Sequence, residues 1–529
     1  MSSQTLSLGA ESARRAPAPA RTDAVTTTRK ARAGMAMSLA TFAMAAASAI
    51  QAVLYLGHFG TNARTDGFFV AFALYSTFGV FSQSLRLTSV PLLVEPGARL
   101  SVREFAITLG FVALPVLVLT GPLAGPLAHL IAPGLSPRSR AVTAAALPVL
   151  GCAMALQLWA AGGATVLAIR DRFTLVAGAY MAGAGAGLVS FLALMSSAGV
   201  QTLGWSMLTM AAVTCAWMAV GLRRSGGLAG GLAGGRAGGS LAPGTIVRNG
   251  GLILGRTAVY LAFNVLFVIT LAFASHATAG GTTVLSYAYL FASYLVAGTG
   301  MALGMSNIPD MTRDARAQRQ ALVTETVPRG FRYAMLIVAP ALAGLIAVAP
   351  LIHALLPHSL STAEVATLRT FVALLVPWTV CALLVNFLLP VLLAVGRAGL
   401  LSALALPLVL VHLAATAAAS ALWGVDGAVG AFFVAPAGFA AVLLVAAAGR
   451  ATAPRLALEL GGDAARFLAL AALAFGAGWA LGTTLPGELA PALVAGVVGS
   501  ALYVVGLRVV AHRQLQVLLG VLVPRPAPA

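Results

Sequence analysis

Residues 334–356 read AMLIVAPALAGLIAVAPLIHALL and carry no charged side chain. An apolar run of about 20 residues is the length that an α-helix needs to cross the hydrocarbon core of a bilayer. The whole chain agrees, because 60% of its 529 residues are hydrophobic and only 9% are charged, whereas soluble domains carry about 25% charged residues. In lipid only helices and closed barrels satisfy every backbone polar group, and barrel strands are only about ten residues long. The sequence therefore predicts an all-α, polytopic membrane protein.

Similar apolar runs recur along the chain and predict about fourteen transmembrane helices. They lie at roughly 34–57, 67–93, 105–132, 142–168, 174–197, 199–222, 249–275, 282–308, 334–356, 365–395, 399–423, 427–448, 467–484 and 490–507. The predicted domains are a disordered cytoplasmic tail at 1–33, an N-lobe of six helices at 34–222, a Gly-rich cytoplasmic linker at 223–248, a C-lobe of six helices at 249–448, two further helices at 449–510 and a cytoplasmic tail at 511–529. Two parallel six-helix repeats around a central cavity are a common transporter plan.

The distribution of positive charge supports this number of helices and gives their orientation. The net charge is +18, with 32 basic residues. If the N-terminus is cytoplasmic, 26 of the 32 fall in cytoplasmic segments, four in external loops, and Arg86 and Arg256 within spans. Basic residues are enriched in cytoplasmic loops of membrane proteins. We therefore predict a bacterial cytoplasmic membrane protein with both termini inside, and we interpret the basic charge as orienting the helices rather than binding nucleic acid.

The chemistry-bearing residues exclude several function classes. All fourteen acidic residues fall in loops or at span ends, whereas proton and sodium relays usually place Asp or Glu inside the membrane. The three cysteines, Cys152, Cys215 and Cys381, are far apart and lack metal or redox spacing. No P-loop, GxSxG or HExxH motif occurs. We therefore expect no cofactor, no metal and no enzymatic activity, and we find no support for ion coupling.

A few polar residues within the spans are candidates for a substrate site. Arg86 and Arg256 are suited to grip a phosphate group in a wet cavity, although Arg256 could instead extend to the cytoplasmic surface and Arg86 could pair with a backbone carbonyl. Asn264, like Asn307 and Asn386, fits either a cavity wall or a bond between helices. His412 lies in the middle of the eleventh span and is better explained as a packed histidine than as a titrating group.

Several motifs resemble the lipid II flippase family (MurJ, also called MviN). Phe59–Phe72, FGTNARTDGFFVAF, is similar to the FGxGxxxDAFFVAF stretch that this family carries between its first two helices. Shorter matches occur at Ser89–Leu93, at Arg172 and Phe173, and in the eighth span at Tyr287 and Ala288, Gly300–Gly304, and Ile308 and Pro309. Together with the fourteen spans, the resemblance covers about residues 34–510.

The resemblance implies a two-lobed bundle that moves an undecaprenyl-linked sugar precursor to the outer leaflet by alternating access. It implies a lipid-linked glycan and membrane lipids as partners, with cell-wall synthesis enzymes as a further kind of partner. Asp66 matches the aspartate of the family motif. Gln51 and Ala52 stand where the family carries an Arg-Asp pair, and Tyr289 and Leu290 replace the Asp-Arg of its ADRL motif. The predicted substrate-binding residues are Gln51, Asp66, Arg86, Arg256 and Asn264, with Arg86 and Arg256 supplying charge from new positions.

Three alternatives to lipid II transport stay open. The same fold could export a different lipid-linked glycan. It could act as a drug or cation antiporter, against which the absence of membrane carboxylates counts. It could also be a transport-inactive scaffold for enzymes of envelope synthesis, which the loss of the family's cationic residues favours.

Overall fold

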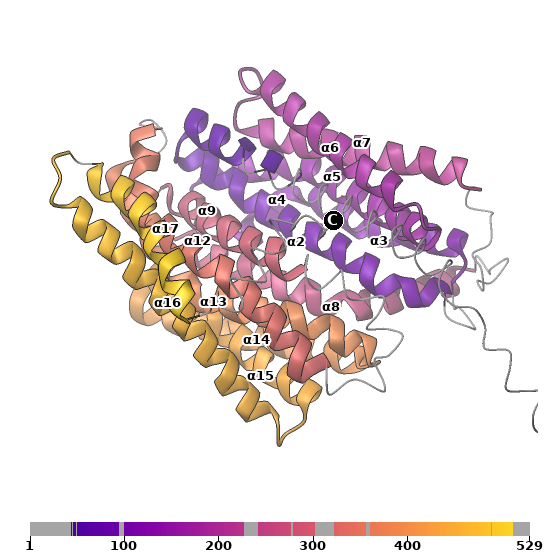
Figure 1. Cartoon of the computed structure of the whole chain (residues 1–529). Coiled ribbons are helices and arrows are strands. Elements are labelled where there is room, and N and C mark those ends of the chain that lie inside the picture. Colours follow the sequence, from indigo (N-terminus) through magenta and orange to yellow (C-terminus); the bar gives the residue numbers. More distant parts are fainter. Residues whose placement is uncertain are drawn as a thin grey trace, which may run out of the picture.

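All regular elements that the computed structural model describes are helices (Figure 1). The described residues are 44, 46–48, 50–94, 100–226, 242–276, 279–301, 322–355, 360–487 and 489–510. A helix at Ala46–Phe59 is followed by α2 (Ala63–Val94), α3 (Val102–Thr120), α4 (Ala124–Ile131), α5 (Pro137–Ile169), α6 (Phe173–Leu194), η2 (Gly199–Gln201), α7 (Thr202–Arg224), α8 (Pro243–Ala274), α9 (Gly281–Val296), η3 (Ala297–Met301), η4 (Leu322–Thr326), α12 (Val327–Leu355), α13 (Thr362–Ala394), α14 (Ala398–Gly430), η5 (Ala431–Phe433), α15 (Val434–Ala448), α16 (Ala453–Gly482) and α17 (Ala490–Val510).

The prediction of an all-α, multi-pass membrane protein is confirmed. Ten described helical segments are long and apolar enough to cross a membrane, and one of them, Ala398–Ala448, covers two predicted spans. Every predicted span coincides with at least part of a described helix. The predicted tails at 1–33 and 511–529, most of the linker, Asn307 and the motif after Met301 lie outside the described residues.

The third predicted span is broken in the structure. It contains two helices, α3 and α4, separated at Gly121–Leu123. Pro122 follows Gly121, and a proline disfavours helical geometry in the residue before it and lacks a backbone N–H. Gly121 accordingly has φ −94° and ψ −97°, which is not helical. The predicted apolar run is present, but the proline divides it into two helices.

The thirteenth span begins earlier than predicted. The sequence predicts a start near residue 467, because charged residues precede that point, but α16 begins at Ala453. Two acidic residues of this first part bind Arg332 of α12: Asp463 Oδ2 lies 2.5 Å from Arg332 Nε, and Glu459 forms a second ion pair. The ion pairs make a charged helical segment compatible with the bundle, which hydropathy alone does not reveal.

Two helical halves meet along a seam formed mainly by α2 and α8. Within the first half α2 packs on α5, α5 on α7 and α6 on α7, and within the second half α13 packs on α9 and α15. Helix α8 packs on α14 and also on α2 and α3 of the first half. We call the helices from Ala46 to α7 the N-lobe and those from α8 to α15 the C-lobe. Figure 1 shows the N-lobe helices on one side and α16 and α17 at the opposite edge, beside α12.

Glycines let α16 and α17 approach closely. A Cβ added to Gly478 would lie 2.9 Å from Ala495 Cα and 2.9 Å from Gly499 N, and one added to Gly482 would lie 2.4 Å from Pro491 Cα. Small residues spaced by four allow such close packing of membrane helices, where dispersion contacts replace the hydrophobic effect. The last two helices therefore form a tight hairpin, which packs on α12.

Candidate functional site

The Asp66 carboxylate joins the two lobes. Asp66 lies in the first turn of α2 and is 4% exposed. Its Oδ2 accepts a hydrogen bond from Gly280 N at 2.6 Å, and its Oδ1 accepts from Thr283 N at 2.9 Å and from Thr283 Oγ1 at 2.7 Å. Gly280 is the N-cap residue of α9 and has no side chain to cap the helix. A carboxylate from the other lobe therefore satisfies the free N–H groups of α9 and interacts with the positive end of its dipole.

Further hydrogen bonds reinforce this contact at the same end of the bundle. Thr283 Oγ1 lies 3.2 Å from Thr65 Oγ1, and Thr61 Oγ1 donates to the Glu364 carboxylate at the start of α13. We call the set Thr61, Thr65, Asp66, Gly280, Thr283 and Glu364 the inter-lobe latch. The charge distribution predicts that this end of the bundle is external. The latch holds the two lobes together there.

The backbone geometry of the Phe59–Phe72 motif explains how the start of α2 comes to lie against α9. Gly60 has φ +61°, which ends the first helix, and Asn62 Oδ1 accepts from Arg64 N at 2.9 Å to start α2. A Cβ at Gly67 would lie 2.1 Å from Ser139 O, so only glycine allows α2 to contact α5 at this point. The next two residues, Phe68 and Phe69, are buried in the N-lobe core. The motif thus fixes α2 against the N-lobe and presents Asp66 to the C-lobe.

Asn264 lies at the middle of the seam. Its backbone oxygen is 3.4 Å from Thr77 Oγ1 of α2, and its side-chain Nδ2 donates to Tyr260 O of its own helix at 2.9 Å. The order of contacts along the seam is antiparallel, because the start of α2 meets residues that follow the end of α8. The structure therefore places the backbone of Asn264, rather than its amide group, in contact with the other lobe.

Arg256 forms part of a polar stripe on α8. It is partly buried, and no hydrogen bond or ion pair joins its guanidinium to another described residue. Asn249 and Tyr260 lie seven residues before and four after it, which puts all three on one helix face. Asn249 Nδ2 and Tyr260 OH are buried and have no hydrogen-bond partner among the described residues. We call Asn249, Arg256 and Tyr260 the donor stripe.

Arg86 belongs to α2, but its side chain lies outside the described part of the chain. Its depth follows from helix geometry. At about 1.5 Å per residue, Arg86 is roughly 14 Å along α2 from Thr77, and Arg256 is roughly 12 Å along α8 from Asn264, towards the same end. The two predicted arginine positions therefore lie at similar depth on facing helices.

Gln51 is placed apart from the other predicted site residues. It is 3% exposed, and its Nε2 donates to Ser206 Oγ at 2.9 Å, which in turn donates to Gly187 O at 2.8 Å. These partners belong to α7 and α6, so the Gln51 amide is bonded within the N-lobe. Asp66 and Asn264 lie along the seam, at the end predicted to be external and at the middle, and Arg256 lies on α8 further towards the other end. The sequence did not indicate five of the residues described above: Gly280, Thr283, Glu364, Asn249 and Tyr260. The only sequence signal for Asn249 and Tyr260 is that both are polar residues within predicted spans.

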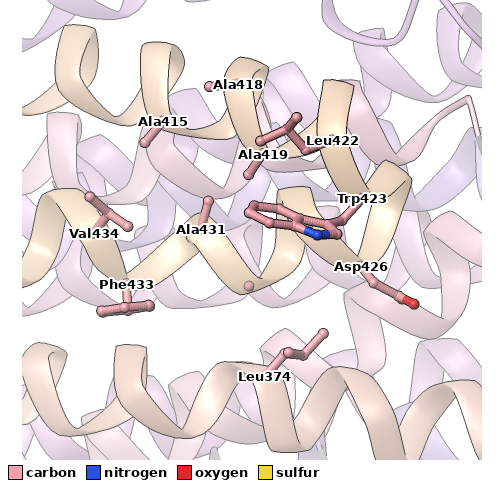
Figure 2. Close-up of a pocket in the computed structure, with 12 residues that line it drawn as sticks. Leu374, Ala415, Ala418, Ala419, Leu422, Trp423, Asp426, Ala431, Phe433 and Val434 are labelled. Carbon is pink, nitrogen blue, oxygen red and sulfur yellow. The ribbon is translucent and has the colours of Figure 1, made fainter.

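A groove on the C-lobe surface holds none of the predicted site residues. Its volume is about 730 Å³, and it lies where α14 loses helical geometry at Trp423 and Gly424. Figure 2 shows Ala415, Phe433 and Val434 towards one end and Trp423 and Asp426 towards the other. Asp426 is its only charged lining residue. Elsewhere in the described ranges, no group of three His, Cys, Asp or Glu residues is arranged to hold a metal ion.

Comparison with solved structures identifies the fold as that of a class of membrane transporters. No protein-family model and no curated protein sequence matches the chain. The structure "Lipid II flippase MurJ, inward closed conformation" matches with a TM-score of 0.66 at 13% identity, covering 90% of this chain and 99% of that one. A point mutant of the Vibrio cholerae MATE transporter VcmN matches with a TM-score of 0.53 at 12% identity, covering 82% and 98%. A MOP superfamily transporter from Pyrococcus furiosus matches with a TM-score of 0.56 at 16% identity, covering 82% and 96%.

The chain therefore has the fold shared by MurJ and the MATE transporters. This confirms the fold that the sequence resemblance implied. At 12–16% identity the likeness concerns the fold, and function is argued from the site.

Proposed function

We propose that this protein is an alternating-access flippase of the bacterial cytoplasmic membrane, with both termini in the cytoplasm. Its substrate is a polyprenyl-linked glycan precursor, similar to lipid II, which it moves from the inner to the outer leaflet. The observation that carries the proposal is the donor stripe, which lies on α8, the C-lobe helix that packs on α2 and α3 of the N-lobe.

The chemistry of the donor stripe favours an oxyanion. A guanidinium and an amide N–H donate hydrogen bonds, and a tyrosine hydroxyl donates readily as well. A buried donor without an acceptor costs about 1–3 kcal/mol, so the side chains of Asn249 and Tyr260 are stabilised by a ligand that supplies oxygen acceptors. A phosphate or pyrophosphate does so and also neutralises Arg256, which it can bind in bidentate geometry.

The inter-lobe latch supports alternating access. The described hydrogen bonds of the latch gather at the predicted external end. A hydrogen bond to a charged group such as Asp66 contributes about 1.5–3 kcal/mol net. Differential binding of a ligand to the two states of the seam is the means by which alternating access would open this end.

A second candidate substrate is a different lipid-linked glycan. Where the lipid II flippases carry Asp-Arg, this chain has Tyr289 and Leu290, both buried, and Tyr289 stacks on Phe267 with ring centroids 3.7 Å apart. Tyr289, Leu290 and Phe267 carry no charge, so any charged contact with the head group would come from other residues, such as Arg256. A transport-inactive scaffold that binds membrane lipids and cell-wall synthesis enzymes is the alternative from another class.

Complementation tests the proposal. The essential lipid II flippase of a bacterial host is depleted while this chain is expressed, and membrane insertion is measured in parallel. We expect the wild type to restore growth and the double variant Arg86→Gln/Arg256→Gln to lose it. Arg223→Gln, at the exposed end of α7, is the matched control and keeps rescue.

Failure has two distinct meanings. An inserted wild-type protein that gives no rescue argues against lipid II and favours another glycan or a scaffold. Rescue that survives the double arginine substitution contradicts the assignment of the charged site.

A further inference from the structure

His412 is a buried imidazole that uses only one of its two ring nitrogens. It lies mid-way along α14 and is 0% exposed. Its Nε2 is 3.0 Å from Leu266 O, 2.9 Å from Thr270 Oγ1 and 3.3 Å from Thr416 Oγ1. Its Nδ1 has no hydrogen-bond partner among the described residues.

The surroundings decide which nitrogen carries hydrogen. A carbonyl oxygen only accepts, so Nε2 donates its hydrogen to Leu266 O. The other tautomer would bury an N–H without an acceptor and would set the Nε2 lone pair against the carbonyl oxygen. Nδ1 therefore carries no hydrogen, and its lone pair lies unpaired inside the C-lobe.

A second buried polar group without a hydrogen-bond partner, the indole N–H of Trp378, lies near His412, and the Phe432 ring lies beside both residues. Trp378 is 2% exposed, and its Nε1–H has no partner in the described part of the chain. The centroid of the Phe432 ring is 5.3 Å from that of His412 and 5.2 Å from that of Trp378. Tyr289 contacts both Trp378 and Phe432. The two rings that carry the unpaired donor and the unpaired acceptor thus both lie beside Phe432, in a cluster contributed by α9, α13, α14 and η5.

We propose that His412 is a proton-binding site in the core of the C-lobe. The proton is taken from water and adds to the Nδ1 lone pair, which forms a new N–H bond and gives the ring a positive charge. Nothing is oxidised or reduced. Histidine is the common proton-binding side chain of proteins, and the Phe432 ring lies beside the imidazole, with centroids 5.3 Å apart and ring planes tilted by 60°.

No other charged group competes for this role within hydrogen-bond distance. The described titratable groups on the elements packed around His412 are Arg248, Arg256 and Tyr260 on α8, Tyr287, Tyr289 and Tyr294 on α9, Glu364, Arg369 and Cys381 on α13, and Asp426 on α14 itself. None of them forms a hydrogen bond or ion pair with His412 in the described structure, and only Tyr289 belongs to the aromatic cluster.

Protonation reverses the hydrogen-bonding character of the site. Before it, Trp378 Nε1 is a donor and His412 Nδ1 an acceptor, and afterwards both are donors. The packing of α14 against η5 and α13 must then change. If the proposed transport function holds, this step couples the C-lobe to the proton gradient, but proton binding itself requires no substrate.

Tryptophan fluorescence measured against pH tests the proposal on full-length protein in lipid nanodiscs. The signal of Trp378 is isolated as the difference between wild type and Trp378→Phe. We expect this difference to fall on acidification along a one-proton curve, because an imidazolium quenches a neighbouring indole. His412→Gln removes the titration, while its amide N–H keeps a donor for Leu266 O. The same pH curve in wild type and His412→Gln overturns the proposal.

Solid-state NMR keeps the test open if His412→Gln does not insert. The wild-type chain is labelled with ¹⁵N-histidine, and the water-inaccessible signal is followed over roughly pH 4–9. Conversion of a neutral Nε2–H ring to a doubly protonated ring supports the site, and an unchanged neutral signal overturns it. Because both measurements omit substrate, a failure of complementation leaves their result standing.

Discussion

Asp66 illustrates how much one side chain contributes beyond its own helix. Its motif was recognisable in the sequence, and the family resemblance marked it as a site residue. Its partners Gly280 and Thr283 lie 214 and 217 residues away, and neither stands out by type or spacing. Gln51 stands where the resembling family carries an arginine, and its buried bond to Ser206 depends on how three helices pack. The sequence therefore indicated which residues are unusual, but the residues they bond to became evident only from the fold.

Asp66→Asn is expected to destabilise the protein by about 1.5–3 kcal/mol, the range for a hydrogen bond to a charged group. The amide keeps one acceptor oxygen but turns an NH₂ group towards either Gly280 N–H or the Thr283 donors, and it removes the charge at the α9 N-terminus. Thermal unfolding in detergent measures the change. Asp426→Asn, an exposed carboxylate with no bond to a described residue, is the control, and an equal melting temperature for both variants would contradict the capping role.

Among the elements, hydropathy located the spans well and their ends poorly. The apolar windows found each span because lipid demands about 20 apolar residues. They missed the break after α3, which depends on Pro122, and the first turns of α16, whose acidic residues bind Arg332. The boundary between the eleventh and twelfth spans agreed closely, because Gly424 adopts φ +62° and ends the helical geometry there.

The α16–α17 hairpin allows a matched pair of glycine substitutions. Gly478→Ala places a methyl group 2.9 Å from the α17 backbone, and such overpacking costs about 1–3 kcal/mol. Gly476→Ala lies on the same helix with nothing within 4 Å, and removing a helical glycine stabilises by up to about 1 kcal/mol. We expect the melting temperature to fall for the first variant and to hold or rise for the second. A similar effect of both would mean that the two helices are not in close contact.

In the whole molecule, the important division is the seam between the lobes. The sequence indicated two six-helix halves and the charge of their loops, and the solved structures share the resulting fold. The sequence did not indicate that hydrogen bonds would gather at one end of the seam, since this depends on the relative position of the lobes. The donor stripe was only partly predicted, because Arg256 is conspicuous inside a span whereas Asn249 and Tyr260 are not.

A disulfide across the latch tests whether this end of the seam must open. Thr65 and Thr283 have hydroxyl oxygens 3.2 Å apart, so Thr65→Cys/Thr283→Cys in a background without the three native cysteines is expected to cross-link. If the protein is a flippase, the oxidised double variant loses complementation and a reductant restores it. Each single cysteine variant is the control. Full rescue by a protein shown to be cross-linked would mean that transport does not require opening here.

The 214-residue separation between Asp66 and Gly280 also has a consequence for biogenesis. A ribosome that adds about 5–20 residues per second needs roughly 10–40 s to proceed from one to the other. During that time the carboxylate has no helix to cap and must stay hydrated at the membrane surface, because an unpaired charge is costly within the bilayer. The bond can therefore form only after about half of the 529 residues have been added. A chain that ends before α9 lacks the partners of this carboxylate, so the start of α9 completes the contact between the first half of the bundle and the second.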